Sequence, residues 1–558
     1  MKELLENMIH SGQITRGDTE FFLKEWNGTA EHPSEEDVQK WLAREYGIRY
    51  SNLSDINPDR ELLSLFPARI LIKHNLLPIR REDDTVEIAT CRLFATEGLD
   101  TLKNITGMML LPVLATTEAI QREMKKHLGV GADTLDTLNE ETAIQVIAED
   151  SDDNIDLSEA AEDASIIRFV NQILTDAISL RATDIHLEPF EDELRIRYRI
   201  DGVLQEIPVP PQIKRFQPAI VSRVKILSHL DIAEKRVPQD GRIKVRLADH
   251  EVDIRVSLIP MLYGEGVVMR LLPQESTLRG LAELKMAERE ERAFRRMLSM
   301  PHGIILVTGP TGSGKTTTLY SALNEINDAI RKIITIEDPV EYHMRGVNQI
   351  QIHEKAGLTF ARGLRSILRH DPDVILVGEI RDSETAQIAI QASLTGHLVF
   401  STLHTNDSPG ALTRLVDMGV EPYLVTSALE GVLAQRLVRT LCMDCREEDT
   451  SEAAHAYRKL ISLKENAVIY RARGCESCRN TGYHGRRAIF ELLVMNEKIC
   501  AMVLDSRSTG EIRQAAREDG LHALSEDGWR LVSESVTTID EVLRVTKTEH
   551  GNENGLRG

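Results

Sequence analysis

Residues 309–316 carry glycines, a lysine and a hydroxyl side chain at the spacing of a phosphate-binding loop. They read Gly309-Pro310-Thr311-Gly312-Ser313-Gly314-Lys315-Thr316. Glycines let the backbone curl so that successive N–H groups can donate into one concavity. In such loops the lysine meets the β- and γ-phosphates and the threonine hydroxyl is a ligand of Mg²⁺. We therefore predict that the loop binds ATP with Mg²⁺; the alternative is a glycine-rich turn without a ligand.

Two strand-like segments further along the chain end in carboxylates. Residues 332–336 precede Glu337 and Glu341, and residues 374–377 precede Glu379. Ligands of open parallel sheets lie beyond the carboxyl ends of the strands, so these acids should meet Lys315 at one edge. Hydrolysis of ATP needs a carboxylate that holds Mg²⁺ or orients a water.

We predict that Glu379 polarises the attacking water. Glu337 or Glu341 would then act on the Mg²⁺ side or serve as the alternative base. The sequence leaves open which acid takes the proton. Glu379 could instead cap the helix that follows it, because acidic residues favour helix N-termini.

A histidine stands at each end of the apolar run 398–403. A histidine at a strand end beside phosphates can sense the γ-phosphate through a hydrogen bond. We expect this sensing role for His404 and for His397. A purely structural role is the alternative for both.

Four of the six cysteines form two Cys-x-x-Cys pairs. Cys442 and Cys445 make the first pair, and Cys475 and Cys478 make the second. Each pair places two thiolates on one tight turn, so two pairs supply the four sulfurs of a tetrahedral Zn²⁺ site. A thioredoxin-like redox pair is the alternative, but it does not explain why there are two. We predict structural zinc.

The segments around the phosphate loop are those of an α/β nucleotide domain. Residues 303–308 are apolar and rich in β-branched side chains, as in a strand buried on both faces. A helical pattern begins at Thr317. The order strand, glycine-rich turn, helix is the context that a phosphate loop requires.

The rest of the chain divides by composition. We expect an N-terminal α+β docking module at 1–128, an acidic flexible linker at 129–164, a second α+β domain at 165–275 and the nucleotide domain at 276–558, with a zinc subdomain at 440–480. The linker has no lysine or arginine and gathers acids in its second half, so it could also be an acidic docking peptide. In the second domain, Arg242 lies in a turn and Arg255 on a strand. On the residues alone, these arginines belong to a solvated sheet face.

Composition limits the possible functions. A net charge of −21 disfavours a surface that binds nucleic-acid phosphates. No apolar run approaches the roughly 18 to 20 residues that span a bilayer, and the first residues lack a signal-peptide core. We expect a cytoplasmic protein.

Taken together, these motifs resemble the secretion ATPases of bacterial type II secretion and type IV pilus assembly. The resemblance covers the chain from about residue 165 to its end. It is carried by the cysteine quartet and by residues 184–189, 238–242, 309–316, 336–342, 357–360, 364–369, 371–382 and 395–406.

This resemblance implies a RecA-like P-loop ATPase domain, a PAS-like second domain and a homohexameric ring. It implies that Arg242 and Arg255 reach the nucleotide phosphates, and that the first module docks on inner-membrane secretion or pilus assembly proteins. The protein would meet the membrane only through those partners. Residues 409–414 favour the type II branch, with a type IV pilus extension ATPase as the alternative. Thr90-Cys91-Arg92 departs from the Asp-Pro turn of many relatives, and the cyclic di-GMP repeat of some relatives is missing.

Three classes of function are thus open. The first is a motor ATPase that assembles a pseudopilus or pilus. A nucleic-acid translocase built on a similar ring is the second, and the acidic composition argues against it. The third is a nucleotide-gated docking module with little turnover.

Overall fold

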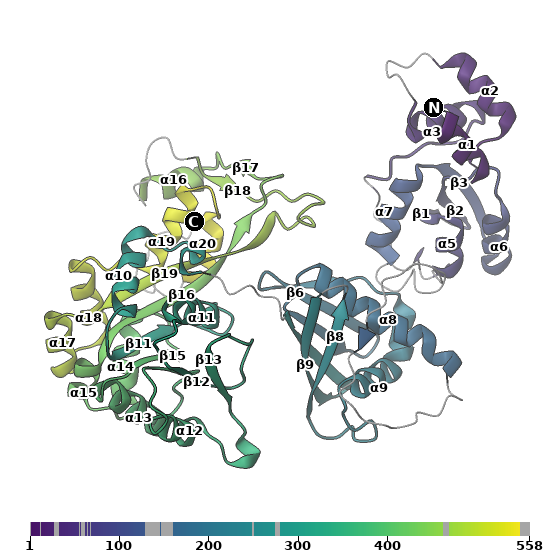
Figure 1. The fold of residues 1–558 in the computed structure, drawn as a ribbon. Helices are drawn as coiled ribbons and strands as arrows, with labels where there is room; N and C mark the ends of the chain where they lie inside the picture. The colour runs from purple at the N-terminus through teal and green to yellow at the C-terminus, as the bar shows by residue number, and fades with distance from the viewer. Residues whose placement is uncertain are drawn as a thin grey trace. The chain divides into compact units, whose positions relative to one another are not determined.

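The computed structural model describes residues 2–11, 13–26, 33–54, 56, 58, 62–63, 65–66, 68–128, 145–146, 160–247, 250–273, 280–460 and 468–546. The chain divides into two compact units, residues 1–275 and 276–558 (Figure 1). Among the described residues, none of the helices is both long and apolar enough to cross a membrane.

The first part of the N-terminal unit is a small α+β module around a three-stranded sheet. Strand β2 lies between antiparallel β1 and parallel β3. Ser34 and Asp37 cap α3 reciprocally. The elements are α1 (Lys2–His10), α2 (Arg16–Glu25), α3 (Glu35–Glu45), α5 (Ala68–His74), β1 (Leu76–Glu82), β2 (Thr85–Thr90), α6 (Glu97–Thr106), β3 (Met109–Leu114) and α7 (Thr117–Leu128).

The second α+β module is an antiparallel sheet with the order β4-β8-β9-β10-β5-β6-β7. Apolar residues alternate along its strands and pack with α8 and α9, which leaves a polar face on the other side of the sheet. The elements are β4 (Gln145–Val146), α8 (Ala160–Ser179), β5 (Asp184–Pro189), β6 (Leu194–Ile200), β7 (Val203–Ile207), η3 (Pro211–Phe216), α9 (Gln217–Leu227), β8 (Gln239–Leu247), β9 (His250–Met261) and β10 (Gly264–Pro273).

Two of these elements begin within the segment 129–164 that we predicted as a linker. Strand β4 pairs with β8, and α8 starts at Ala160. The rest of the predicted linker lies outside the described residues.

The C-terminal unit is built on a seven-stranded sheet with the order β13-β12-β14-β15-β11-β16-β19. All neighbouring strands are parallel except β16 and β19. The strands are β11 (Gly303–Thr308), β12 (Ile333–Glu337), β13 (Val347–Gln351), β14 (Val374–Val377), β15 (Leu398–Leu403), β16 (Leu429–Leu441) and β19 (Tyr483–Val494).

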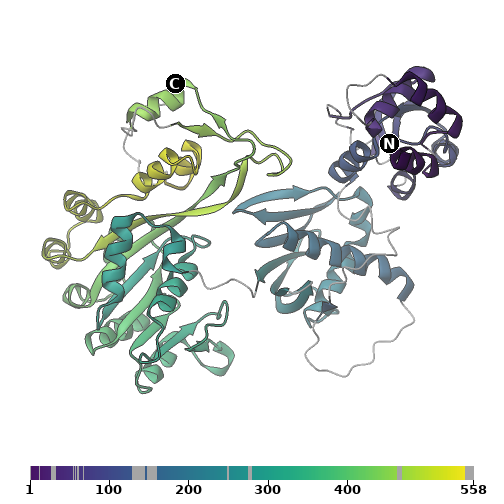
Figure 2. The ribbon, with the colours of Figure 1, turned by 45° about the horizontal axis from the view of Figure 1, so that its top comes forward.

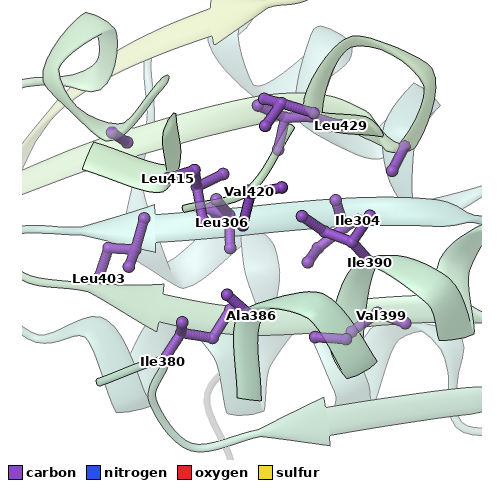
Figure 3. Close-up of a cluster of buried hydrophobic side chains, with 14 of the residues drawn as sticks. Ile304, Leu306, Ile380, Ala386, Ile390, Val399, Leu403, Leu415, Val420 and Leu429 are labelled. Atoms are coloured by element: carbon purple, nitrogen blue, oxygen red, sulfur yellow. The ribbon is translucent and has the colours of Figure 1, made fainter. Parts of the chain in front are cut away.

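Helices cover both faces of this sheet. Ile304 and Leu306 of β11 belong to the cluster shown in Figure 3, where Ile390 comes from a covering helix. The alternate residues, Ile305 and Val307, belong to the cluster on the opposite face. Burial on both faces is why the strand reads as one continuous apolar run. The helices are η4 (Leu281–Leu284), α10 (Glu288–Leu298), α11 (Lys315–Ile326), η5 (Glu354–Ala356), α12 (Phe360–Ile367), α13 (Ser383–Leu394), α14 (Ser408–Asp417) and α15 (Pro422–Ala428).

A subdomain extends from the long β16–β19 pair, and helices complete the unit (Figure 2). A capping box of Ser508 and Glu511 begins α18. The remaining elements are β17 (Glu447–Glu448), α16 (Glu452–Leu460), β18 (Tyr470–Arg471), α17 (Glu497–Leu504), α18 (Thr509–Glu518), α19 (Leu524–Ser533) and α20 (Ile539–Thr546).

Candidate active site

The loop of residues 309–314 joins the C-terminal end of β11 to the N-terminus of α11. Gly309, Gly312 and Gly314 have φ angles of 147°, 79° and 90°, which side chains other than glycine rarely adopt. A Cβ on Gly309 would lie 2.5 Å from the carbonyl oxygen of Gln435. One on Gly314 would lie 2.7 Å from Nε2 of the same residue. The loop therefore fits against β16 only with glycine at both positions.

Gln435 is a buried residue of β16 that sequence reasoning missed. The hydroxyl of Thr318, on the first turn of α11, donates a hydrogen bond of 2.6 Å to its Oε1 atom. A glutamine inside the apolar run of β16 could have revealed this role from the sequence, because a buried side-chain amide needs hydrogen-bond partners. Gln435 thus holds the phosphate loop and its helix against the sheet.

The side chain of Lys315 folds back onto the phosphate loop. Its ammonium donates to the carbonyl oxygens of Gly309 at 2.8 Å and Pro310 at 3.1 Å. Burial lowers the pKa of Lys315 to about 8; the positive charge of Arg436 lowers it further, whereas Glu379 opposes the shift. The lysine, the loop N–H groups and the start of α11 form a positive concavity that suits phosphate.

Glu379 follows β14 after one intervening residue, Gly378, and lies close enough to Lys315 for its charge to raise the pKa of the lysine. Its carboxylate contacts Nη2 of Arg381 at 2.5 Å and Nε2 of His404 at 3.4 Å. The N-cap of α13 is Asp382, whose side chain accepts from the backbone N–H of Thr385 at 2.7 Å. The alternative in which Glu379 caps the following helix is therefore wrong.

His404 lies on the loop after β15, which is fastened to the end of β11. The hydroxyl groups of Thr308 and Thr405 are 2.7 Å apart, and the Thr405 N–H donates to the Thr308 hydroxyl at 2.9 Å. These bonds place the His404 loop beside the phosphate loop.

His397 lies at the other edge of the sheet. Strands β11 and β15 are parallel with Gly303 opposite Leu398, so the residue before Leu398 is at the edge where β11 begins. Its Nδ1 atom is 2.9 Å from the carbonyl oxygen of Ala392 and 3.3 Å from the hydroxyl of Thr395. His397 therefore lies away from the phosphate loop with local contacts, which argues against our hypothesis that it senses the γ-phosphate.

Glu337 is buried, and hydrogen bonds occupy both of its oxygens. It accepts from the hydroxyl of Thr335 at 2.6 Å and from that of Tyr320, on α11, at 2.5 Å. Burial raises the pKa of Glu337, although these donors oppose the shift. The same Tyr320 hydroxyl accepts from the backbone N–H of Glu341 at 3.4 Å. Glu337 thus connects β12 to the helix of the phosphate loop.

Arg242 and Arg255 lie in the N-terminal unit, directly opposite each other on β8 and β9. They are on the polar face of that sheet, and Arg242 is exposed. Their contact with a nucleotide stays a prediction.

The four cysteines meet at the end of the β16–β19 pair. Their sulfur atoms all lie within 4.8 Å of one another. The Sγ–Sγ distance is 3.9 Å for Cys442 and Cys475, and 3.7 Å for Cys478 with either Cys445 or Cys475. Sulfurs about 2.3 Å from a tetrahedral zinc ion are about 3.8 Å apart. The four thiols therefore fit one metal ion.

The family model of the type II/IV secretion system protein matches residues 159–544, which is more than half of the chain. The chain belongs to the type II/IV secretion system protein family. The model of the MshEN domain matches residues 46–133.

Relatives of this secretion family protein include members of both branches. Over 406 residues it is 50% identical to the type II secretion system protein E of Pseudomonas aeruginosa, which covers 73% of this chain and 80% of the relative. Over 552 residues it is 39% identical to the type IV pilus assembly ATPase PilB of Myxococcus xanthus, covering 96% and 97%. The Legionella pneumophila ATPase DotB shares the fold, with 22% identity, a TM-score of 0.50 and coverage of 68% of this chain and 95% of DotB. The predicted family and fold class are confirmed.

The pKa of Lys315 makes the binding of MgATP depend on pH. Phosphate binds the ammonium form, so affinity should be constant below the pKa of about 8. Above it, affinity should fall by about tenfold per pH unit, because binding then requires uptake of a proton. Titrations between about pH 7 and 9.5 test this, since that range brackets the shifted pKa. Lys315→Arg, which stays charged, should bind more weakly but with a flat profile; a flat profile in the parent would contradict the prediction.

The bond between Thr318 and Gln435 predicts a coupled pair. Gln435→Leu leaves the Thr318 hydroxyl buried without its partner, which should lower the free energy of unfolding by about 1–3 kcal/mol. Adding Thr318→Val should recover part of that loss. Urea unfolding of the parent, both single variants and the double variant measures the coupling. Strictly additive losses would show that the bond contributes nothing.

Proposed function

We propose that this protein hydrolyses ATP at the edge of the sheet where Lys315 and Glu379 meet. The observation that carries the proposal is this meeting of a glycine-rich phosphate cradle with a carboxylate that follows β14, two strands away from β11 in the sheet. Lys315 binds the β- and γ-phosphates and Thr316 is a ligand of Mg²⁺. Mg²⁺, when bound, neutralises charge on the phosphates.

In this proposal Glu379 accepts a proton from the attacking water. Its contacts with Arg381 and His404 hold the carboxylate toward the concavity. His404 senses the γ-phosphate by donating a hydrogen bond. Glu341 is the alternative base, and Glu337 acts by positioning, since its oxygens are engaged in the core.

ATP turnover in turn drives assembly of a pseudopilus for type II protein secretion. The identity of 50% to a type II secretion system protein E supports this branch. A type IV pilus extension ATPase is the second candidate, supported by the match to PilB along nearly the whole chain. The two differ in whether a strain lacking the protein loses secretion or pili.

The working form is a cytoplasmic homohexamer. Its first module docks on inner-membrane assembly proteins, and the protein contacts the membrane only through them. Arg242 and Arg255 bind the nucleotide phosphates when domains close. The net charge of −21 favours protein partners over nucleic acid.

The cysteine quartet holds a structural zinc ion. Distances of 3.7 to 3.9 Å between the sulfurs support four-thiolate ligation. The backbone N–H of Gly482 donates to Sγ of Cys478 at 3.2 Å, which favours the thiolate that a metal requires.

Removing the carboxylate of Glu379 should stop hydrolysis without stopping binding. Glu379→Gln should lower kcat by about 10²–10⁴-fold, the contribution of a general base, and keep the affinity for MgATP. Lys315→Ala should lose binding. Phosphate release and equilibrium binding measure the two quantities.

Glu384→Gln is the matched control for Glu379→Gln. This glutamate is exposed on α13 and pairs with Arg365, so the substitution changes the same charge outside the concavity. It should turn over like the parent. Full activity of Glu379→Gln together with loss in Glu341→Gln would move the base to Glu341.

Purified protein should contain about one zinc ion per chain. Cys475→Ser should lose the metal and loosen the subdomain between β16 and β19, while MgATP still binds, because the thiols lie away from the phosphate loop. The control is Cys500→Ser on α17, which should keep the metal. Elemental analysis together with hydrogen exchange measures both effects. A folded parent with less than about half an equivalent of zinc would contradict the four-thiolate site.

A further inference from the structure

Arg436 lies one residue beyond Gln435 on β16, next to the start of the phosphate loop. Strand β16 runs parallel to β11, with Ala434 opposite Thr308, the last residue of β11. The two residues that follow on β16 therefore flank Gly309. The close approach of Gly309 to the Gln435 carbonyl confirms this neighbourhood.

The side chain of Arg436 reaches from β16 to the loop after β15. Its Nη2 atom donates to the backbone carbonyl and to the side-chain oxygen of Asn406, each at 3.2 Å. Strands β15 and β16 lie on opposite sides of β11 in the sheet. The loop after β15 passes the C-terminal end of β11, since Thr405 bonds to Thr308 and Ser408 bonds to Glu491 of β19. Arg436 therefore meets this loop close to the point where the phosphate loop begins.

Positive charge gathers at this crossing point. Arg436 is close enough to Lys315 for their charges to repel, and His404 is two residues before Asn406. Glu379 is the carboxylate whose charge opposes this repulsion at Lys315. Cations held this close together are stabilised when an anion lies between them.

We propose that Arg436 binds the γ-phosphate of ATP within the same chain, from the side of the loop opposite Glu379's strand. This inference rests on the proposed function. A guanidinium has five N–H donors in a planar fork, so it can hold Asn406 and a phosphate oxygen together. The γ-phosphate would then connect the phosphate loop to the His404 loop through Arg436. ADP, which lacks that phosphate, would leave this connection unmade.

The test compares the binding of MgATP and MgADP to the full chain. Arg436→Gln should weaken MgATP by about tenfold or more, the loss expected for one charge-assisted hydrogen bond. MgADP should change by less than about threefold, a loss too small for a phosphate contact. Arg436→Lys should recover part of the MgATP affinity because it restores the charge.

Two controls separate this contact from other effects. Arg517→Gln removes an exposed arginine of α18 and should bind both nucleotides like the parent. Asn406→Ala removes the side-chain partner of Arg436 and should keep most of the MgATP affinity. Unchanged MgATP binding in Arg436→Gln would overturn the inference, as would equal losses in Arg436→Gln and Asn406→Ala.

Folding is checked by thermal unfolding. If Arg436→Gln does not fold, Arg436→Lys takes its place. The quantity compared is then the ratio of the affinities for MgATP and MgADP. The same ratio in Arg436→Lys and Asn406→Ala would overturn the inference. A parent protein that binds no MgATP would instead refute the proposed function.

Discussion

The parallel pairing of β16 with β11 is the constraint on which the active site depends. It puts Gln435 against Gly309 and Gly314, so the loop backbone can pass only without side chains there. The same register places Arg436 beside the start of the phosphate loop, where it contacts Asn406. Further along, the strand reaches Cys442, whose N–H donates to the carbonyl oxygen of Gly482 at 2.9 Å. One strand thus positions the phosphate loop, a cation beside it and the cysteine quartet.

The strands and motifs of the nucleotide domain could be predicted because their signals are local. Residues 304–307 alternate between two cores, so all four are apolar, and the run is visible without knowing its neighbours. The cysteine pairs were likewise visible, because each turn brings its own two sulfurs together. Their union across 29 intervening residues follows from the antiparallel β16–β19 pair, which returns the chain to its starting point.

What sequence reasoning missed depends on strand order and direction. His397 and His404 flank the same apolar run and look alike in composition, but parallel pairing sends them to opposite edges of the sheet. Glu337 is the last residue of β12 and Glu379 comes two residues after β14, yet only Glu337 has both oxygens bonded by Tyr320 and Thr335. Gln435 and Arg436 gain their importance only because β16 is the neighbour of β11. The local sequence pattern of a single strand does not indicate which strands will be its neighbours or in which direction they will run.

The arginines of the second module show how the register of a sheet can create a site that favours an anion. Across four adjacent strands, Arg242, Arg255, Arg270 and Asp184 occupy one continuous row. Like charges directly opposite each other destabilise a sheet. Asp184 offsets part of this repulsion, since it contacts Arg270 at 3.0 Å and Arg199, on the next strand, at 3.6 Å. Arg242, Arg255 and Arg270 therefore stand side by side in a row in which their like charges repel. A phosphate ligand would offset this repulsion, which is a physical argument for the prediction that Arg242 and Arg255 bind the nucleotide.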